Sequence, residues 1–172
     1  MALPERRDPD TDERTRRLSS LLERAQTYYE GVLWGMSGAT ARAYLLDSRG
    51  LDEPTLRAFG VGFAPAGGGL LRYLQSDSFS SAELVAAGVA GQADDGRLYD
   101  FFRERVVFPI RDAHGRTIAF GGRALDGASP KYLNPGTARC STSRRRCSRS
   151  TWRGSRWPRR ARRWSSRATW TR

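Results

Sequence analysis

Apolar side chains recur at intervals of three and four residues near the start of the chain, from Leu18 to Val32. This spacing is typical of an amphipathic helix that turns one face toward a core. We expect that helix over residues 12–34, with acidic residues in its first turn and with Gly35 and Gly38 ending it. The same period returns in shorter stretches, which predict further helices over residues 37–49, 52–59, 70–75 and 80–87. Asp52 is the expected N-cap of the helix over 52–59, and Ser80 or Ser81 that of the helix over 80–87.

The pattern changes to that of β-strands after Gly96. Strands are predicted over residues 61–65, 97–100, 105–112 and 116–123, with the turn at 113–115 joining the last two into a β-hairpin. Helices therefore fill the first half of the chain, and antiparallel strands follow. This order predicts an α+β fold, in which the helical first half packs on a small antiparallel sheet.

The composition changes abruptly near the C-terminus. From Cys140 to Arg172 the chain contains no Leu, Ile, Val, Met, Phe, Tyr, Lys, Asp or Glu. Without aliphatic side chains there is no core to bury, so we expect residues 140–172 to be disordered. One interpretation is an arginine-rich arm that binds nucleic acid. The other is that residues 136–172 are translated from a shifted reading frame.

The shifted frame can be worked out by hand, because Trp has a single codon. Starting one nucleotide earlier turns each Trp codon into one for Leu, Val or Met, and turns Ser codons of the TCN type into apolar ones. Permitted codons then give Leu-Phe-His-Lys from Cys140, and Val-Val-Val-Glu-Gly-Tyr-Met-Asp over residues 164–171. The second string is typical of a buried strand that runs into an acidic turn. Other codon choices are allowed, so both interpretations of the tail stay open at this point.

The excess of positive charge lies in this tail. The whole chain has 30 Lys and Arg against 18 Asp and Glu, a net charge of +12. Residues 136–172 hold 13 Arg and no acidic residue, which leaves residues 1–135 with a net charge of −1. The high isoelectric point therefore says nothing about the folded part. Both cysteines, Cys140 and Cys147, also lie in the tail, so residues 1–135 carry no signal for a disulfide or a zinc site.

No apolar run approaches the length of a membrane-spanning helix, and no signal peptide opens the chain. We therefore expect a soluble, cytoplasmic protein with no membrane contact. Its predicted organisation is a flexible leader over residues 1–11, one domain over residues 12–135, and the out-of-frame Arg/Trp/Ser-rich tail over residues 136–172.

A series of motifs covers almost the whole predicted domain. The motifs are Ala41-Arg42-Ala43-Tyr44-Leu45, Arg49-Gly50-Leu51, Phe59-Gly60-Val61-Gly62-Phe63-Ala64-Pro65, Tyr99-Asp100-Phe101-Phe102-Arg103-Glu104-Arg105-Val106-Val107-Phe108-Pro109-Ile110-Arg111-Asp112, Phe120-Gly121-Gly122-Arg123 and Pro130-Lys131-Tyr132-Leu133-Asn134. The early motifs are weak alone, whereas the run from Tyr99 to Asn134 is highly specific. Together they resemble the N-terminal subdomain of the catalytic core of bacterial replicative DNA primase. In that family Leu-Phe-x-Lys and Val-Glu-Gly-Tyr-Met-Asp follow, and the shifted frame of the tail permits both.

The resemblance implies primer synthesis, in which ribonucleoside triphosphates are condensed on a single-stranded DNA template. In the family, carboxylates of a TOPRIM domain hold the Mg²⁺ or Mn²⁺ ions of the reaction. Arg167 occupies the place of the first of these carboxylates, and a guanidinium cannot coordinate a cation. We therefore expect this chain to keep no catalytic residue, no metal site and no cofactor, and to be inactive alone. The zinc-binding domain and the C-terminal region that meets the replicative helicase are also expected to be absent.

The resemblance assigns contacts with template and nucleotide phosphates to Arg49, Arg123 and Lys131, with Tyr132 and Asn134 as neighbours. Lys131 is the only lysine and follows a proline in an expected exposed turn, which suits phosphate contact. Arg123 follows two glycines, which allow a ligand to approach closely. Arg49 fits equally well as a cation at the end of a helix.

Other polar and aromatic residues are expected to be structural. We predict solvated strand faces or ion pairs for Arg103, Glu104, Arg105 and Arg111, an inert turn position for His114, and core or helix-face positions for Tyr28, Tyr29 and Trp34. Metal binding by Asp100 and Asp112 is disfavoured, because a strand's length separates them. The glycines at 67–69 lack the strand and Lys/Ser context of a phosphate loop and predict a flexible turn.

Overall fold

The computed structural model describes residues 9–125 and 129–135. The helical segments are α1 (Pro9–Trp34), η1 (Met36–Gly38), α2 (Ala39–Ala43), η2 (Tyr44–Ser48), α3 (Glu53–Phe59), α4 (Leu70–Leu74), η3 (Gln75–Asp77) and α5 (Ser81–Ala86). The strands are β1 (Gly62–Ala64), β2 (Ala90–Gln92), β3 (Leu98–Asp100), β4 (Arg105–Arg111), β5 (Thr117–Ala124) and β6 (Tyr132–Leu133). The expectation of disorder over residues 140–172 lies outside the described residues.

The long first helix ends where the sequence predicted but begins earlier. α1 starts at Pro9, so the last part of the expected leader is helical. Proline is tolerated there because its missing N–H would have no helical partner in the first turn. Its buried residues follow the predicted spacing and are Leu18, Leu21, Leu22, Ala25, Tyr29 and Leu33.

The helix expected over residues 37–49 is divided into three kinds of turn. A 3-10 turn, η1, leads into the α-helix α2, which continues as the π-helical turn η2. Gly38 permits this close return of the chain, because a Cβ atom there would lie 2.2 Å from the carbonyl oxygen of Leu33. The sequence pattern located the helical stretch but not the change of helix type within it.

Two short helices begin at the caps that the sequence predicted. Asp52 accepts a hydrogen bond from the Thr55 N–H at 2.9 Å at the start of α3. Ser80 and Glu83 form a capping box at the start of α5, in which each side chain accepts from the other residue's backbone N–H.

The strands form two antiparallel sheets. The larger has the order β1-β4-β5-β6, and β2 pairs with β3 in the smaller one. The strands β1 and β3 and the hairpin of β4 and β5 were predicted, whereas β2 and β6 were not. Pro109 can lie in β4 because β1 pairs only with residues 105–107, which leaves the edge of β4 beside the proline without a partner strand.

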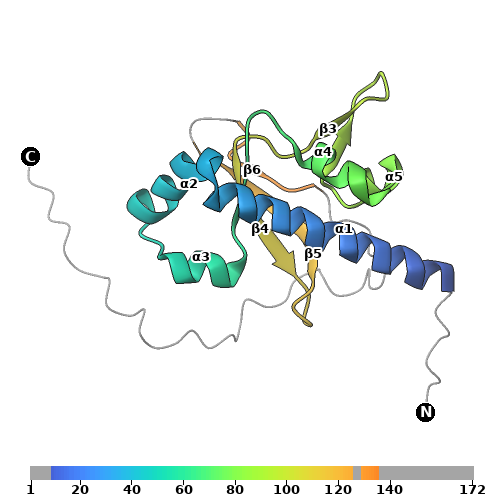
Figure 1. Ribbon diagram of the computed structural model, residues 1–172, viewed down its shortest axis with the longest axis horizontal. Helices are drawn as coiled ribbons and strands as arrows, with labels where there is room; N and C mark the ends of the chain where they lie inside the picture. Colours follow the sequence, from blue (N-terminus) through green and yellow to red (C-terminus); the bar gives the residue numbers. More distant parts are fainter. Residues whose placement is uncertain (1–8, 126–128, 136–172) are drawn as a thin grey trace, which may run out of the picture. The chain divides into compact units, whose positions relative to one another are not determined.

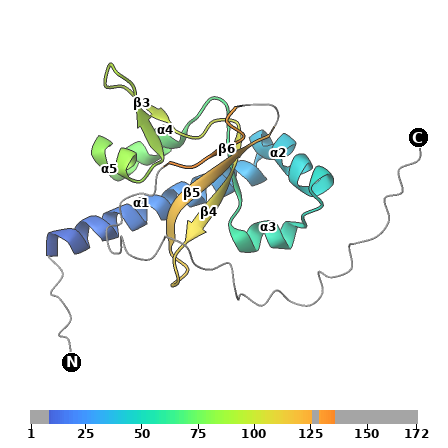
Figure 2. The ribbon, with the colours of Figure 1, turned by 180° about the vertical axis from the view of Figure 1, so that it is seen from behind.

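Helices cover both faces of the larger sheet, which confirms the α+β prediction. α1 crosses one face, in front of β4 and β5 in Figure 1 and behind them in Figure 2. There Tyr29 makes an edge contact with Phe120 of β5, and a core extends to α4 and α5. On the other face Phe63 and Val106 pack with residues of η2 and α3, including Leu45 and Leu56.

The glycine turn before α4 is held by a buried side chain and is not a flexible linker. The Asp100 carboxylate accepts hydrogen bonds from the N–H groups of Gly69, Leu70 and Leu71, at 2.6, 3.0 and 3.1 Å. Gly68 and Gly69 both adopt positive φ angles, of 67° and 123°, which only glycine takes without strain. Asp100 is thus a structural anion that satisfies the first N–H groups of α4.

No helix in the described ranges, 9–125 and 129–135, is long and apolar enough to cross a membrane.

Candidate nucleic-acid interface

Four side chains from three elements meet in what we call the arginine–tyrosine cluster: Tyr44, Arg49, Arg123 and Tyr132. The hydroxyl oxygen of Tyr44 accepts from Arg49 Nε at 2.9 Å and Nη2 at 2.6 Å, and from Arg123 Nε at 3.1 Å. Arg123 Nη1 donates to the Tyr132 hydroxyl at 2.6 Å. The structure therefore brings together Arg49, Arg123 and Tyr132, which the sequence assigned to one site.

Strand pairing places Arg123 beside Tyr132. The two residues are directly opposite each other in the β5–β6 register, so their side chains share one face of the sheet. The Arg123 guanidinium carbon lies 5.2 Å from the centre of the Tyr132 ring. Tyr132 keeps 61% of its surface exposed, which leaves its ring accessible to a ligand.

Asn134 lies on the same side of the sheet, and Lys131 lies at its edge. Asn134 approaches β5 so closely that a Cβ atom on Gly121 would lie 2.9 Å from its side-chain oxygen. Lys131 is exposed, as predicted, and its backbone carbonyl accepts from the Ala124 N–H at 3.0 Å. Its side chain takes no part in the hydrogen bonds of the arginine–tyrosine cluster.

Tyr44 was not singled out from the sequence, although it lies in one of the quoted motifs. Its pKa is lowered from the ordinary tyrosine value, chiefly by the hydrogen bond from Arg49 and then by that from Arg123. Tyr44 and Arg49 are five residues apart, a spacing that does not bring side chains together in a regular α-helix. They meet here because η2 is a π-helical turn. Nothing in the sequence pattern predicts such a turn.

Arg105 differs from its prediction as a solvated strand residue. Only 7% of its surface is exposed, and its Nη1 donates to the carbonyl oxygen of Pro130 at 2.8 Å. The side chain therefore ties β4 to the segment that carries Lys131 and Tyr132. Sequence alternation failed here because Gly122 on the neighbouring strand leaves room for the arginine stem, whose Cδ would lie 3.2 Å from a Cβ at that position.

Other charged residues in and beside β4 are solvent-facing or lie in the turn that follows it. Arg103 and Arg111 are exposed, and the Arg103 guanidinium lies 5.5 Å from the Tyr99 ring centre. The Asp112 carboxylate accepts from the N–H groups of His114 and Arg116 within the β4–β5 turn. In residues 9–125 and 129–135, no three His, Cys, Asp or Glu side chains gather where they could hold a metal ion.

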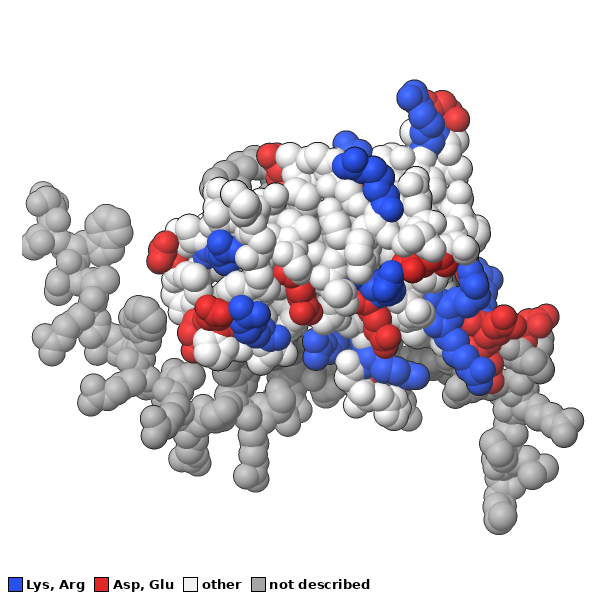
Figure 3. Space-filling view, viewed as in Figure 1, with Lys and Arg blue, Asp and Glu red and all other residues white. Residues whose placement is uncertain are grey.

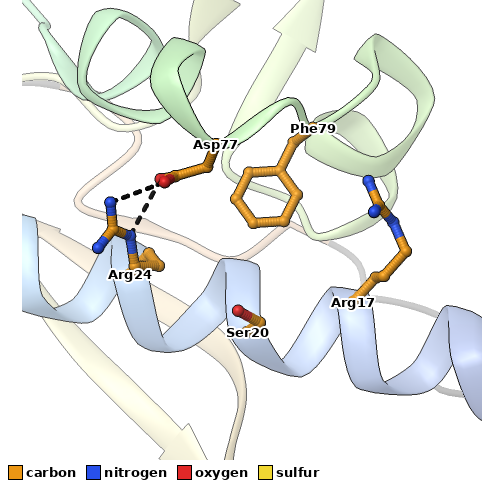
Figure 4. Close-up of a pocket in the computed structure, with 5 residues that line it drawn as sticks. All are labelled: Arg17, Ser20, Arg24, Asp77 and Phe79. Carbon is orange, nitrogen blue, oxygen red and sulfur yellow. Dashed lines mark hydrogen bonds and ion pairs between the residues drawn. The ribbon is translucent and has the colours of Figure 1, made fainter.

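A shallow groove of about 360 Å³ lies elsewhere, between α1 and the segment that joins η3 to α5. Figure 4 shows its lining, with Arg24 bonded to Asp77 and the Phe79 ring between Arg17 and Arg24. Arg17 and Arg24 are both taken up by ion pairs, Arg17 with Glu83 and Arg24 with Asp77. Their charges are therefore already neutralised, which makes the groove a weaker phosphate site than the arginine–tyrosine cluster.

Charges of both signs are mixed on the face of the molecule seen in Figure 3. Lys and Arg lie next to Asp and Glu along its lower part, and a broad area above them carries few charges. No large basic patch dominates this face. Because residues 1–135 have a net charge of only −1, phosphate binding by the folded part would depend on a local group of cations.

Comparison with known proteins identifies relatives that match about two thirds of the chain. The family model described as DNA primase catalytic core, N-terminal domain, matches residues 28–140. A DNA primase of Pseudomonas putida is 44% identical over 119 residues, which cover 68% of this chain and 18% of that protein. A DNA primase of Escherichia coli K12 is 42% identical over 118 residues, covering 68% of this chain and 20% of the relative. The chain thus spans about a fifth of the length of these curated relatives.

Solved structures resemble the fold over a similar part of the chain. The DnaG primase catalytic domain bound to single-stranded DNA superposes with a TM-score of 0.67 at 40% identity, over 72% of this chain and 40% of that one. The E. coli primase catalytic core gives a TM-score of 0.61 at 42% identity, over 68% and 37%. The RNA polymerase domain of Mycobacterium tuberculosis DnaG gives a TM-score of 0.63 at 37% identity, over 70% and 40%.

Proposed function

The chain belongs to the family of the DNA primase catalytic core, N-terminal domain, and from this premise we propose that its folded part contacts the phosphates of a single-stranded DNA template and of incoming ribonucleoside triphosphates. The residues that we assign to these contacts are Arg49, Arg123 and Lys131, with Tyr132 and Asn134 beside them.

The observation that carries the proposal is the pairing of two arginines without an acidic partner. Among the described residues, no carboxylate lies within ion-pair distance of Arg49 or Arg123. Each guanidinium has five N–H donors, and the hydrogen bonds to Tyr44 and Tyr132 use only some of them. Phosphate oxygens suit the remaining donors, because guanidinium groups bind them with two parallel hydrogen bonds.

The exposed ring of Tyr132 supports a single-stranded ligand in particular. Unpaired bases stack on accessible aromatic rings, and this contact is tolerant of sequence. Arg123 over the same ring would place a phosphate contact next to a stacked base. A double-stranded ligand, whose bases are already stacked, would not use the ring in this way.

The described residues do not fit the divalent metal that a primase needs. Asp100, the one buried carboxylate, already accepts three backbone N–H groups. We therefore propose that the Mg²⁺ or Mn²⁺ ligands of the family enzyme lie in a TOPRIM domain and not in this subdomain, and that this chain makes no primer by itself. The same proposal assigns contact with the replicative helicase to a C-terminal region of the family enzyme and not to this subdomain, and it includes a cytoplasmic location.

The test is binding of a fluorescein-labelled oligo(dT) by fluorescence anisotropy at several salt concentrations. We expect the double variant Arg49→Ala/Arg123→Ala to weaken binding, and to reduce the slope of log affinity against log salt by about 1.4 for two lost phosphate contacts. Arg97→Ala is the matched control, since Arg97 is exposed and paired with Asp95. Equal salt slopes for the double variant and the control would refute the proposed site.

A second candidate function belongs to the tail, which has 13 Arg, four Trp and no acidic residue over residues 136–172. Such a segment could bind single strands without sequence preference by phosphate neutralisation and stacking. Deletion of residues 136–172 separates the two candidates. Loss of all oligo(dT) binding on deletion would assign binding to the tail, whereas retained binding that depends on Arg49 and Arg123 would assign it to the folded part.

We also propose that the tail arises from a shifted reading frame. Its composition supports this, as does the end of the family match at residue 140, close to where the composition changes. Resequencing the coding DNA across codons 134–140 tests it. One missing nucleotide, whose restoration makes every later codon start one nucleotide earlier, would mean that the frame continues into the Val-Glu-Gly-Tyr-Met-Asp strand. A confirmed sequence would mean that the arginine-rich segment is made as such.

A further inference from the structure

We propose that Tyr44 is a positioning residue, whose phenolic oxygen holds the guanidinium groups of Arg49 and Arg123 at one point so that both address the same run of phosphates. This inference rests on the proposed function and adds to it the residue that organises the site. Tyr44 itself need not contact the nucleic acid.

The geometry places three N–H donors on one oxygen. Arg49 donates through both Nε and Nη2, and Arg123 donates through Nε, all within 3.1 Å of the Tyr44 hydroxyl oxygen. The two arginines come from distant parts of the chain, the C-terminal end of η2 and the C-terminal end of β5. Two cations this close repel each other, so a shared acceptor is required to hold them together before a phosphate arrives.

The π-helical turn explains how Tyr44 reaches Arg49. In an α-helix, side chains three or four residues apart are neighbours, and those five apart are not. In η2 the Arg49 N–H instead bonds to the Tyr44 carbonyl oxygen at 3.1 Å, a step of five residues. The Arg49 guanidinium carbon consequently lies 5.0 Å from the centre of the Tyr44 ring, with its donors on the hydroxyl. The π-helical turn η2 therefore brings the Arg49 guanidinium into contact with Tyr44.

The direction of the pKa shift of Tyr44 agrees with its hydroxyl oxygen acting as a hydrogen-bond acceptor. The hydrogen bonds from Arg49 and Arg123 lower the pKa of Tyr44, because they stabilise negative charge on its oxygen. A phenylalanine at this position would keep the ring and its packing against the Leu45 and Val106 core. It would leave the two guanidinium groups without their common partner, so packing and positioning can be separated experimentally.

The test compares Tyr44→Phe with Tyr28→Phe in the full chain. Tyr28 provides a matched control, because its hydroxyl donates to the backbone carbonyl of Gly68 and contacts neither arginine. Two readouts are used: anisotropy of labelled oligo(dT), and the alkaline titration of tyrosine followed by ultraviolet absorbance. The tail arginines are the same in all variants, so differences between variants report on the cluster.

We expect Tyr44→Phe to weaken oligo(dT) binding about fivefold, because the arginines lose their preorganisation, and Tyr28→Phe to leave it unchanged. Adding Tyr44→Phe to Arg49→Ala/Arg123→Ala should cause no further loss, since nothing is left to position. In the titration, the tyrosine with the lowest pKa should vanish in Tyr44→Phe, and its pKa should rise in Arg49→Ala/Arg123→Ala. Oligo(dT) should raise that pKa in the unsubstituted chain by drawing the guanidinium groups to phosphate.

The outcomes distinguish the proposed phosphate site from the positioning role of Tyr44 within it. If Arg49→Ala/Arg123→Ala weakens binding and Tyr44→Phe does not, the positioning role is wrong and the phosphate site stands. If neither weakens binding, both are wrong. If Tyr44→Phe is too unstable for binding measurements, the titration decides: a low-pKa tyrosine that is insensitive to the two arginines would overturn the positioning role.

Discussion

At the scale of single residues, the most buried charges within 9–125 and 129–135 are satisfied by the backbone. Asp100 accepts three N–H groups at the start of α4, and Arg105 donates to the carbonyl of Pro130. Burial of a charge is costly unless hydrogen bonds compensate it, and backbone groups supply that compensation here. Neither residue is therefore free for a metal or a phosphate, although both lie in the most specific motif of the chain.

Glu83 provides a residue-scale prediction about pH. The hydrogen bond from Arg17, followed by that from the Ser80 N–H, lowers the pKa of Glu83 from 4.5 to about 2. A carboxylate with a depressed pKa in the folded state stabilises the fold above its unfolded pKa and loses that effect as pH falls toward the folded value. We expect this contribution to be lost between pH 4.5 and about 2.

Chemical unfolding of the unsubstituted chain and of Glu83→Gln, from pH 6 downward, measures this effect. The difference between them should be about 1 kcal/mol near neutral pH, since solvent screens a pair in which Arg17 is 45% exposed, and should shrink toward zero in acid. Glu53→Gln, which removes the carboxylate of a more exposed pair with Arg57, is the control. A difference for Glu83→Gln that stays constant with pH would contradict the assignment.

At the scale of elements, the arginine–tyrosine cluster depends on segments that are too short to be recognised in the sequence. β6 has two residues, and it carries Tyr132 next to Arg123. It is held in place by pairing with β5 and by the Arg105 hydrogen bond to Pro130. The π-helical turn η2 likewise places Arg49 next to Tyr44. Local irregularities of this kind build the site on an otherwise regular scaffold.

We predict that Arg105→Met will loosen β6. The substitution keeps an apolar stem but removes the donor to the Pro130 carbonyl, and the loss of this hydrogen bond costs about 1 kcal/mol. Urea unfolding should show this loss, and the Ala124 amide, which donates to Lys131, should exchange its hydrogen faster. Arg103→Met is the control, because Arg103 is exposed. Equal stability and equal exchange of the two variants would show that Arg105 is not the anchor.

At the scale of the whole molecule, the described residues contain two hydrophobic clusters. Every buried apolar residue in the described ranges lies between Leu18 and Ala124, and all but Ala119 and Ala124 belong to two clusters on the two faces of the larger sheet. Pro135 still packs against the chain, since a Cβ atom on Gly88 would lie 2.8 Å from it. The composition of residues 136–172 offers no aliphatic side chains to add to either cluster.

We therefore predict that residues 1–135 fold on their own. Deletion of residues 136–172 should leave a single cooperative thermal transition, with a Tm within about 2 °C of that of the full chain, because a loss of even 1 kcal/mol would shift it by more. Circular dichroism measures this directly. The absence of a cooperative transition in the shortened chain would instead favour an inactive gene product that cannot fold alone.

The sequence by itself determined the elements whose signals are local and periodic. The spacing of apolar residues predicted α1, the caps Asp52 and Ser80 set the starts of α3 and α5, and alternation located the β4–β5 hairpin. Motifs also pointed to Arg49 and Arg123 before any geometry was known. Composition alone separated the tail, because a segment without aliphatic residues has nothing to bury.

Only the tertiary structure decided which of these residues meet. Tyr44 became the centre of the site because a π-helical turn and a strand from distant parts of the chain converge on its hydroxyl. Arg105 and Asp100 became structural because their neighbours in space, and not in sequence, offered a carbonyl and three N–H groups. Periodicity reports the side of an element on which a residue lies. The partner that it finds there depends on long-range packing, which no local pattern encodes.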